Sequence, residues 1–399
     1  MAETPPEAHI DSRPTRASPV VRVELVSDSI AEPVAAFFRS VWDESSTAES
    51  VRGARHLAAS SNPSVPRAEP PAVAYLRDEE VIGYLGTIPT SFWDGNAEIP
   101  GYWLKGFMVL PEYRNGPVGF SMLKEILKYV EVSGILTVAP PARRLFAAVG
   151  YADCGVLPNY LGILNPSGIA EKLDVGAIGL GLPNWLRHLV RVSQRAGLAA
   201  AIGAVVGLIP QLRRLRRARA GGFEAMDAGP GLAHEDLDDL WRQARLGIAA
   251  GAKRSATFMS RYSSGSGKSY QTLHVRETAG QRRLRAVAVV RRPAEAPDAR
   301  LRGIRVATLA DILFCPAEPA AGVAAVLSAE RAARRMGADA LLCSTAHPAI
   351  VQALNRCAWL RLPGNVHLMI RDAAHAANLR LTSRDWWVMR GDASADEAF

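Results

Sequence analysis

Residues 109 to 119 read VLPEYRNGPVG, and this stretch decides how the chain is interpreted. It follows an apolar run that predicts a strand over residues 102–110, and it leads into a helix predicted over residues 118–131. The first N–H groups of a helix have no partner inside the helix, and the positive end of the helix dipole lies behind them. The loop glycines let a ligand approach the backbone, and Arg114 adds a positive charge. This pattern predicts a binding site for a phosphate-sized anion.

The segments around this loop have an α+β pattern. Alternating apolar and polar residues predict strands, and apolar residues three and four apart predict helices. Two prolines open the last helix, where proline is tolerated, and Gly150 ends it. The predicted elements are a strand at 21–27, helices at 31–44 and 50–59, strands at 72–77, 81–88 and 102–110, a helix at 118–131, a strand at 135–138, a helix at 140–150 and a further strand.

A second block of elements follows from Phe223 onward. Its predicted elements are a helix at 235–246, strands at 270–275, 284–291 and 304–314, a helix over 323–333, a strand at 340–343 and a helix at 348–355. The order β-β-β-α-β-α repeats that of the first block, which predicts a duplicated architecture. We therefore expect a disordered tail at 1–20, a first domain at 21–165, a helical linker at 166–222 and a second domain at 223–399.

The predicted linker has two interpretations. An uncharged apolar run at 196–209 is followed by an arginine-rich segment at 211–220. The run has about 14 residues, fewer than the roughly 20 needed to span a bilayer. In one interpretation residues 186–219 lie at a membrane surface, with the arginines on anionic lipid headgroups. In the other, two helices are buried between the domains and the arginines face water.

Composition limits the classes of function. The length of 399 residues suits two or three domains of ordinary size. The net charge is +8, yet no basic stretch alternates with aromatic residues, so a nucleic-acid partner is not expected. The four cysteines form no CxxC pair and have no metal-ligand spacing. We expect reduced thiols, no bound metal and a cytoplasmic location, with peripheral contact at the inner membrane in the first interpretation of the linker.

The loop resembles that of the GNAT superfamily of acyl-CoA-dependent N-acyltransferases. In that family the loop reads Arg or Gln, two residues, Gly, one residue, then Gly or Ala, commonly after V-x-P-x-x. Val109, Pro111, Arg114 and Gly119 match this pattern. Pro117 stands at the first glycine position and removes one N–H donor. The order of elements over about residues 21–164 is also similar to that of the family.

The resemblance implies a fold, a co-substrate and a binding site. The fold would be α+β, with two GNAT-like domains, each a mixed, splayed sheet flanked by helices, joined by the basic helical linker. The co-substrate would be acetyl-CoA or another acyl-CoA. Its pyrophosphate would lie on the loop and its pantetheine arm along the preceding strand. The residues implied are Arg114, Asn115, Gly116, Val118 and Gly119 in the loop, and Phe107, Met108 and Val109 in the strand.

The catalytic groups are less well defined by the resemblance. Many family members protonate the leaving thiolate with a tyrosine four residues before the closing glycine. Here the closing motif is FAAVGY at 146–151, so Phe146 occupies that position and has no proton to donate. The remaining candidates for acid and base are Tyr151, Lys105 and Glu98. The resemblance favours transfer of an acyl group, such as acetyl, to an amine of a small molecule or amino sugar. The alternative is a catalytically silent protein that binds acyl-CoA or acts as a scaffold.

The second block lacks a phosphate loop. Its residues 314–322 contain no arginine, and Glu318 would repel phosphates. Residues 254–262 (RSATFMSRY) and 385–392 (DWWVMRGD) are similar to segments of tandem GNAT-like proteins linked to bacterial polysaccharide and cell-envelope loci. We therefore expect a degenerate second copy that covers the acceptor site. The residues expected to line the acceptor approach are Arg261, Tyr262 and Trp386.

Overall fold

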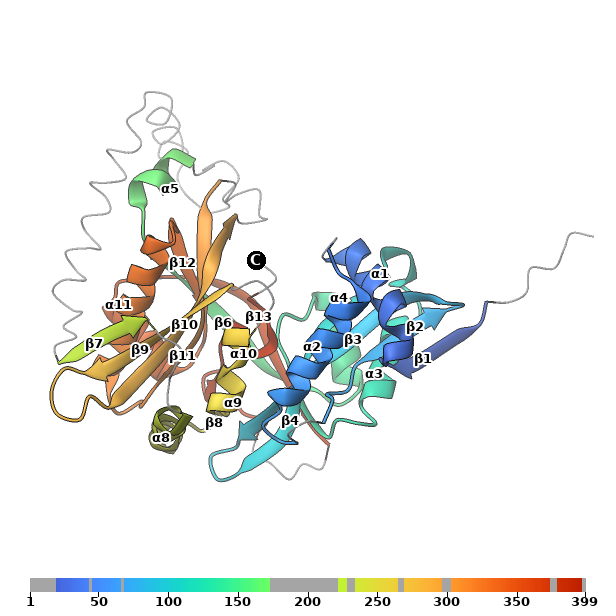
Figure 1. Cartoon of the computed structure of the whole chain (residues 1–399), viewed down its shortest axis with the longest axis horizontal. Helices are drawn as coiled ribbons and strands as arrows, with labels where there is room; N and C mark the ends of the chain where they lie inside the picture. Colours follow the sequence, from blue (N-terminus) through green and yellow to red (C-terminus); the bar gives the residue numbers. More distant parts are fainter. Residues whose placement is uncertain are drawn as a thin grey trace, which may run out of the picture.

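A single mixed β-sheet runs through both halves of the chain in the computed structural model (Figure 1). The structure describes residues 19–42, 45–65, 68–172, 222–227, 234–264, 269–295, 303–373 and 379–396. Most of the predicted tail and most of the predicted linker, including residues 186–219, lie outside the described residues. We call the described part up to Lys172 the first half and the part from Gly222 onward the second half.

The first half follows the predicted order of elements. Its strands are β1 (Val21–Leu25), β2 (Val73–Arg77), β3 (Glu80–Trp93), β4 (Glu98–Val109), β5 (Val132–Ile135) and β6 (Ala152–Ile163). Its helices are α1 (Ala31–Val41), α2 (Ala48–Ser60), α3 (Val118–Ile126), α4 (Pro140–Ala148) and α5 (Pro166–Lys172), with 3-10 turns η1 (Asp28–Ile30) and η2 (Pro111–Tyr113). Gly150 has a φ of +95° just after α4, as expected of a glycine that ends a helix.

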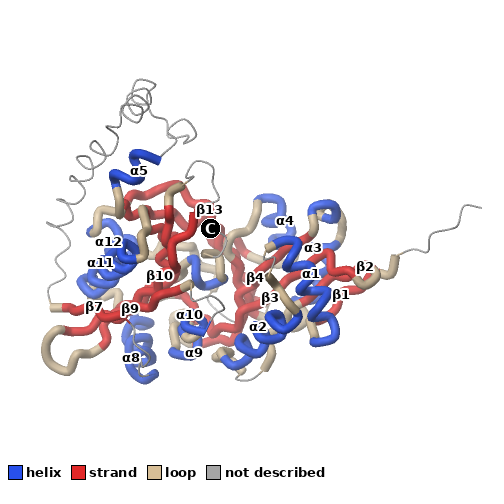
Figure 2. Tube along the Cα trace, turned by 45° about the horizontal axis from the view of Figure 1, so that its top comes forward, coloured by secondary structure: helices blue, strands red, loops and turns tan. Residues whose placement is uncertain are grey.

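Helices cover both faces of the sheet in the first half (Figure 2). Ala74 and Leu76 of β2 pack in a cluster with residues of α1. Val73 and Tyr75 pack with residues of α3 and α4. Successive residues of a strand point to opposite faces, so these clusters define an α1 face and an α3 face. The predicted mixed sheet flanked by helices is confirmed.

The second half has its own strands and helices. The strands are β7 (Phe223–Asp227), β8 (Ala250–Ala252), β9 (Tyr270–Glu277), β10 (Leu284–Glu295), β11 (Arg305–Phe314), β12 (Ala340–Ser344), β13 (Leu360–Asp372) and β14 (Trp386–Trp387). The helices are α8 (His234–Ala244), α9 (Ala256–Met259), α10 (Arg261–Ser264), α11 (Pro319–Arg335) and α12 (Pro348–Arg356), with 3-10 turns η3 (Arg245–Gly247) and η5 (Arg390–Ala393). β11 and β12 are parallel and joined by α11, as β4 and β5 are joined by α3.

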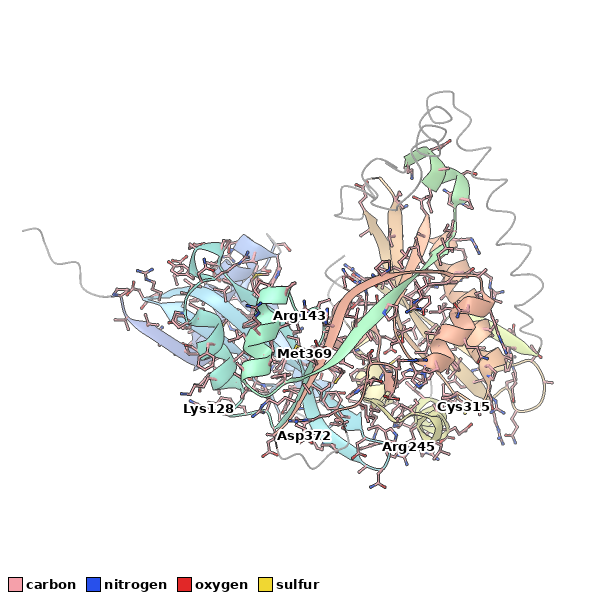
Figure 3. All side chains as sticks on the ribbon, turned by 180° about the vertical axis from the view of Figure 1, so that it is seen from behind. Lys128, Arg143, Arg245, Cys315, Met369 and Asp372 are labelled. Carbon is pink, nitrogen blue, oxygen red and sulfur yellow. The ribbon has the colours of Figure 1, made fainter. Side chains whose placement is uncertain are left out.

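The two halves exchange strands. β13 comes from the second half but lies between β5 and β6, antiparallel to both, with Met369 opposite Ile135 and Ile370 opposite Ala152. β6 comes from the first half and also pairs with β12 of the second. Figure 3 shows β6 and β13 side by side between the halves. The domain boundaries at residues 165 and 222 stay a prediction, and the hydrogen bonds of the sheet cross between the two predicted domains.

One hydrophobic core continues across the junction. Phe92 of β3 and Trp103 of β4 lie edge to face, with ring centroids 5.1 Å apart. Trp386 of β14 packs on both of them, at 5.9 Å and 6.4 Å. All three belong to the cluster that forms the core of the second half. Within the described ranges, no helix has the length and apolar character to cross a membrane.

Candidate active site

The parallel strands β4 and β5 separate at one end. They pair only over residues 102–104 and 133–135. Beyond that point β4 continues to Val109, whereas β5 ends at Ile135. β4 is buried at Leu104 and becomes exposed at the next residue, Lys105. The parting of the strands leaves an open edge of β4 with backbone groups that are free of β5.

A bulge lies at the point where the strands part. Tyr84 of β3 faces Met108 and Gly86 faces Lys105, so β4 has one more residue than β3 between these pairs. Gly106 lies in the bulge with a φ of +63°, a left-handed conformation that favours glycine. Gly106 is not among the site residues predicted from the sequence. A glycine inside an aromatic-rich strand was the available signal, because such a glycine often marks a bulge.

The loop after β4 presents unpaired backbone donors. α3 begins at Val118 with Pro117 as its N-cap, and no side chain caps it. The N–H of Gly116 donates to the carbonyl oxygen of Tyr113 at 3.1 Å, so this donor is used internally. The other donors have no acceptor among the described residues; they are the N–H groups of Asn115, Val118, Gly119 and Phe120. Residues 114 to 117 are exposed and Val118 is buried, so the Asn115 donor lies at the surface beside the N-terminus of α3.

Arg114 connects the loop to the open strand edge. Its Nε donates to the carbonyl oxygen of Val109 at 3.0 Å, and a terminal nitrogen lies 3.8 Å from the Met108 sulfur. A Cβ at Gly119 would stand 3.0 Å from the Phe107 ring, so that ring lies directly against the loop. The structure therefore brings together the cofactor-binding residues predicted on β4 and in the loop.

This arrangement fits the diphosphate and pantetheine arm of an acyl-CoA. Unpaired N–H groups at a helix N-terminus, with a guanidinium beside them, suit a diphosphate. The free edge of β4 offers backbone groups to the amides of an extended chain, as an unpaired strand edge does. Within the described ranges no cluster of three or more His, Cys, Asp or Glu side chains could hold a metal ion.

Tyr151 is part of the core on the α3 face. Its hydroxyl lies 2.6 Å from the Ser133 hydroxyl, and its ring packs edge-on against Phe146 at 5.1 Å. Only 4% of Tyr151 is exposed. Burial raises the pKa of Tyr151 well above its ordinary value, although the Ser133 hydrogen bond opposes this. The phenol stays protonated and is packed in the core beside Phe146 of α4.

Lys105 and Glu98 lie at different places on β4. Lys105 is exposed at the bulge, opposite Gly86. Glu98 begins the strand, roughly 35 Å from its other end at ~3.3 Å per residue. The structure therefore brings Lys105, but not Glu98, to the open edge.

The Glu98 carboxylate is hydrogen-bonded to residues of the second half. It accepts hydrogen bonds from Lys253 at 2.7 Å, Arg245 at 3.1 Å and the Trp241 indole at 3.2 Å. Partial burial acts to raise the pKa of Glu98, but these hydrogen bonds and positive charges outweigh it and hold the pKa below its ordinary value. The carboxylate is a weak base at neutral pH and helps to join the two halves.

Two parallel strands of the second half, β11 and β12, also separate at one end, but other residues of the second half occupy the space between them. β11 and β12 pair only over residues 306–308 and 340–342. Beyond them, Arg390 of η5 donates to the Ser344 hydroxyl of β12 at 2.6 Å. A Cβ at Gly391 would stand 2.7 Å from the Ala310 carbonyl oxygen of β11, so η5 also lies directly against that strand. The space that is open in the first half is occupied in the second by residues 390–393.

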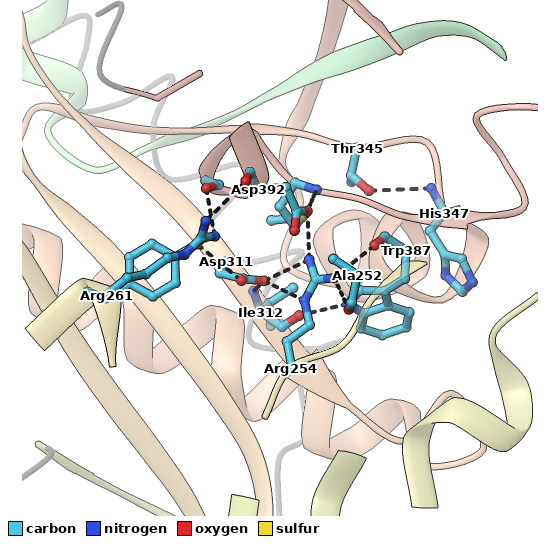
Figure 4. Close-up of polar contacts among 12 residues, drawn as sticks. Ala252, Arg254, Arg261, Asp311, Ile312, Thr345, His347, Trp387 and Asp392 are labelled. Carbon is cyan, nitrogen blue, oxygen red and sulfur yellow. Dashed lines mark hydrogen bonds and ion pairs between the residues drawn. The ribbon is translucent and has the colours of Figure 1, made fainter. Parts of the chain in front are cut away.

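A buried polar network holds η5 in place (Figure 4). Arg254 is fully buried and forms ion pairs with Asp311 at 3.3 Å and Asp392 at 2.7 Å. The Tyr262 hydroxyl donates to Asp311 at 3.2 Å. Arg261 donates to the carbonyl oxygens of Gly391 and Asp392 at 2.7 Å and 3.0 Å. Arg261, Tyr262 and Trp386, predicted for the acceptor approach, are thus placed in internal packing.

Asp392 lies close to a second carboxylate, Asp311, and to the arginines Arg254 and Arg261 in this network. Burial is the largest effect on Asp392 and, with repulsion from Asp311, raises its pKa to about 6 despite the attraction of Arg254. One carboxyl oxygen of Asp392 is buried without a hydrogen-bond partner among the described residues. A proton on that oxygen would remove the repulsion between Asp392 and Asp311, which agrees with the direction of the shift.

The loop that precedes α11 is unsuited to an anion. Glu318 is the N-cap of α11 and pairs with Arg285 at 2.9 Å. A Cβ at Gly247 would stand 3.1 Å from Pro316, so η3 packs directly on this loop. This loop therefore carries a negative charge and is covered by η3, whereas the loop before α3 carries Arg114 and is exposed.

A shallow hollow lies on the shared strands. It has a volume of ≈ 370 Å³, and it is lined by Val156, Pro158, Arg361, Leu362, Pro363 and Gly364. These residues belong to β6 and β13, the strands exchanged between the halves. None of the predicted site residues lines this hollow.

Comparison with known proteins shows a likeness in structure. No family model matches the chain, and no curated protein matches its sequence. N-myristoyltransferase of Saccharomyces cerevisiae with bound myristoyl-CoA is similar with a TM-score of 0.55 and 10% identity, over 93% of this chain and 90% of that one. A GCN5-related N-acetyltransferase from Anabaena variabilis is similar with a TM-score of 0.50 and 10% identity, over 89% of this chain and 73% of that one. The predicted resemblance is confirmed at the level of the fold: the chain has the fold of GNAT-type acyltransferases.

Proposed function

We propose that the chain is an acyl-CoA-dependent N-acyltransferase whose co-substrate binds the first half. The supporting observation is that unpaired N–H groups of the loop lie beside the open edge of β4. The pyrophosphate would be held by Arg114, Asn115, Val118 and Gly119, and the pantetheine arm by Phe107, Met108 and Val109. Residues 390–393 fill the corresponding space in the second half, so one acyl-CoA would bind per chain.

The reaction would join an amine nitrogen to the thioester carbonyl carbon. The carbon–nitrogen bond forms, the carbon–sulfur bond breaks, and the thiol leaves with the proton that the amine loses. Lys105 is exposed at the bulge, where the thioester end of the arm is expected. A positive charge there lowers the pKa of a neighbouring ammonium and increases the neutral, nucleophilic fraction. Lys105 would therefore favour the reactive form of the acceptor.

The acceptor would be an amine of a small molecule or an amino sugar. A role in bacterial polysaccharide or envelope synthesis rests on the resemblance of residues 254–262 and 385–392 to tandem GNAT-like proteins of such loci. Contact of residues 186–219 with a membrane surface, like the cytoplasmic location, rests on the sequence alone. A silent acyl-CoA-binding or scaffold protein is the second candidate, because Phe146 is fully buried and carries no proton donor.

Calorimetry with CoA and acetyl-CoA tests the loop assignment. Arg114→Glu should weaken binding by about 1.5–3 kcal/mol, roughly ten- to a hundredfold, the scale of a charge-assisted contact. Arg292→Glu makes the same charge change at an exposed position of the second half and serves as the control. Equal affinity in wild type and Arg114→Glu would contradict the assignment. Binding with no thiol release in the presence of amines would favour the silent protein.

A further inference from the structure

An exposed indole stands at the end of α1, beside the bulge. Trp42 is 46% exposed. Its ring lies edge-on to Phe37 and tilted against Phe38, with centroids 5.9 Å and 5.1 Å away. A Cβ at Gly106 would stand 3.1 Å from the tip of the indole. The aromatic neighbours hold a partly open ring at the point where β4 parts from β5.

Tyr84 lies next to this indole on the same face. The two ring centroids are 6.1 Å apart. A Cβ at Gly86 would stand 2.7 Å from the Tyr84 hydroxyl oxygen, and one at Gly106 would stand 3.4 Å from its ring. Two glycines on adjacent strands thus make room for the ring. The hydroxyl has no hydrogen-bond partner in the part of the chain that the structure describes. Burial raises the pKa of Tyr84 to about 12, so the phenol stays protonated at neutral pH.

Lys105 lies on the same face as Tyr84. It is the cross-strand partner of Gly86, so its side chain leaves the face on which Tyr84 lies. The open edge of β4 is therefore bordered by a flat apolar ring and two hydrogen-bond donors. A cationic group stacked on the indole would be repelled by Lys105. A ring with an apolar C–H face and oxygens on its rim matches both the ring and the donors.

We infer that Trp42 and Tyr84 form the acceptor-binding surface, and that the acceptor amine is carried by a sugar ring. The ring packs its C–H face on Trp42, and a rim oxygen accepts a hydrogen bond from Tyr84. This inference rests on the proposed function, because it places the acceptor where the thioester reaches the open edge. The loop lies on the opposite face with α3, so acceptor and diphosphate do not compete for space.

Bisubstrate adducts test the surface without knowledge of the natural acceptor. In one adduct the CoA sulfur is joined through a CH₂–CO unit to the nitrogen of glucosamine, and in a second it is joined to that of glycinamide. Calorimetry compares both with CoA for wild type, Trp42→Ala and Tyr84→Phe. The control is Tyr129→Ala, since Tyr129 is also 46% exposed but lies after α3. Thermal melting of each variant identifies any that fail to fold, and Tyr84→Phe keeps the packed ring.

We expect the glucosamine adduct to bind more tightly than CoA, and we expect this gain in affinity to depend on Trp42 and Tyr84. In wild type the glucosamine adduct should bind about tenfold more tightly than CoA, and the glycinamide adduct should gain less. Trp42→Ala and Tyr84→Phe should lose the gain while binding CoA as wild type does, and Tyr129→Ala should keep it. A gain that persists in both variants, or one equal for glycinamide, would overturn the inference and leave the proposed function standing. Failure of wild type to bind CoA and both adducts would overturn the two together.

Discussion

The replacement Arg254→Met tests the buried network that holds η5 in the second half. Arg254 is fully buried and donates to two carboxylates, Asp311 and Asp392, as well as to the carbonyl oxygens of Ala252 and Trp387. Methionine replaces the apolar stem of the arginine but is shorter and has no charge. The variant therefore leaves two buried carboxylates without their arginine.

The expected cost follows from that uncompensated charge. Removal of one partner from a buried ion pair typically lowers the free energy of unfolding by 3–5 kcal/mol, and we expect a loss of about this size. Asp392→Asn in the same chain should recover part of it, because it removes one stranded charge. In wild type the pKa of Asp392 is about 6, above the ~3.9 of an unfolded aspartate. The folded state thus binds more protons between those values, so acidification should favour folding at this site. Without Arg254 this effect should be larger.

Urea unfolding, followed by circular dichroism at pH 7.5 and pH 5, measures these effects. The series contains wild type, Arg254→Met, Asp392→Asn and the double variant, with Arg242→Met as a control at an arginine whose side chain is 65% exposed. We expect the cost of Arg254→Met to be smaller at pH 5 and the double variant to be more stable than the sum of the single effects predicts. A cost below about 1 kcal/mol, or strict additivity at both pH values, would refute the reasoning.

Two further predictions concern titratable side chains. Burial lowers the pKa of His347 to about 4, below the ~6.5 of an unfolded histidine. Between these pH values the unfolded state binds more protons than the folded state. The free energy of unfolding therefore falls as the pH drops from 6.5 towards 4. Between pH 6.5 and 4, His347→Gln should reduce the slope of the free energy of unfolding against pH by roughly 1.4 kcal/mol per pH unit. The same slope in the variant and in wild type would contradict this. Glu98→Gln should lower stability by about 1 kcal/mol or less, because its ion pairs are partly exposed. It should leave kcat/KM of acyl transfer unchanged, and a tenfold loss would restore Glu98 as a catalytic candidate.

Local signals in the sequence were sufficient for the elements around the loop. The strand, loop and helix of residues 98–126 are consecutive, and each is set by its own periodicity and by loop residues. The same holds for the second parallel unit, β11, α11 and β12. β13 was missed because Pro363 and Gly364 interrupt its alternation. In the structure this interruption is a shift of register between Leu362 and Val366.

The candidate site was only partly accessible from the sequence. Arg114 and the loop glycines, which we propose bind the diphosphate, are neighbours along the chain, so a motif can indicate them. Trp42, Tyr84 and Gly106 come from different elements and meet only when α1 packs on the sheet. The RSATFMSRY and DWWVMRGD segments suggested an acceptor site, but the structure places their arginines in buried contacts.

The sequence by itself determined the type and order of most elements, and it predicted anion binding at the loop after β4. Those properties depend on residues that are neighbours along the chain. Only the tertiary structure decided that β13 lies between β5 and β6, and that residues 390–393 fill the space between β11 and β12. Side-chain alternation shows that a segment is a strand, but every strand offers the same backbone donors and acceptors. The choice of partner depends on packing between residues far apart in the sequence.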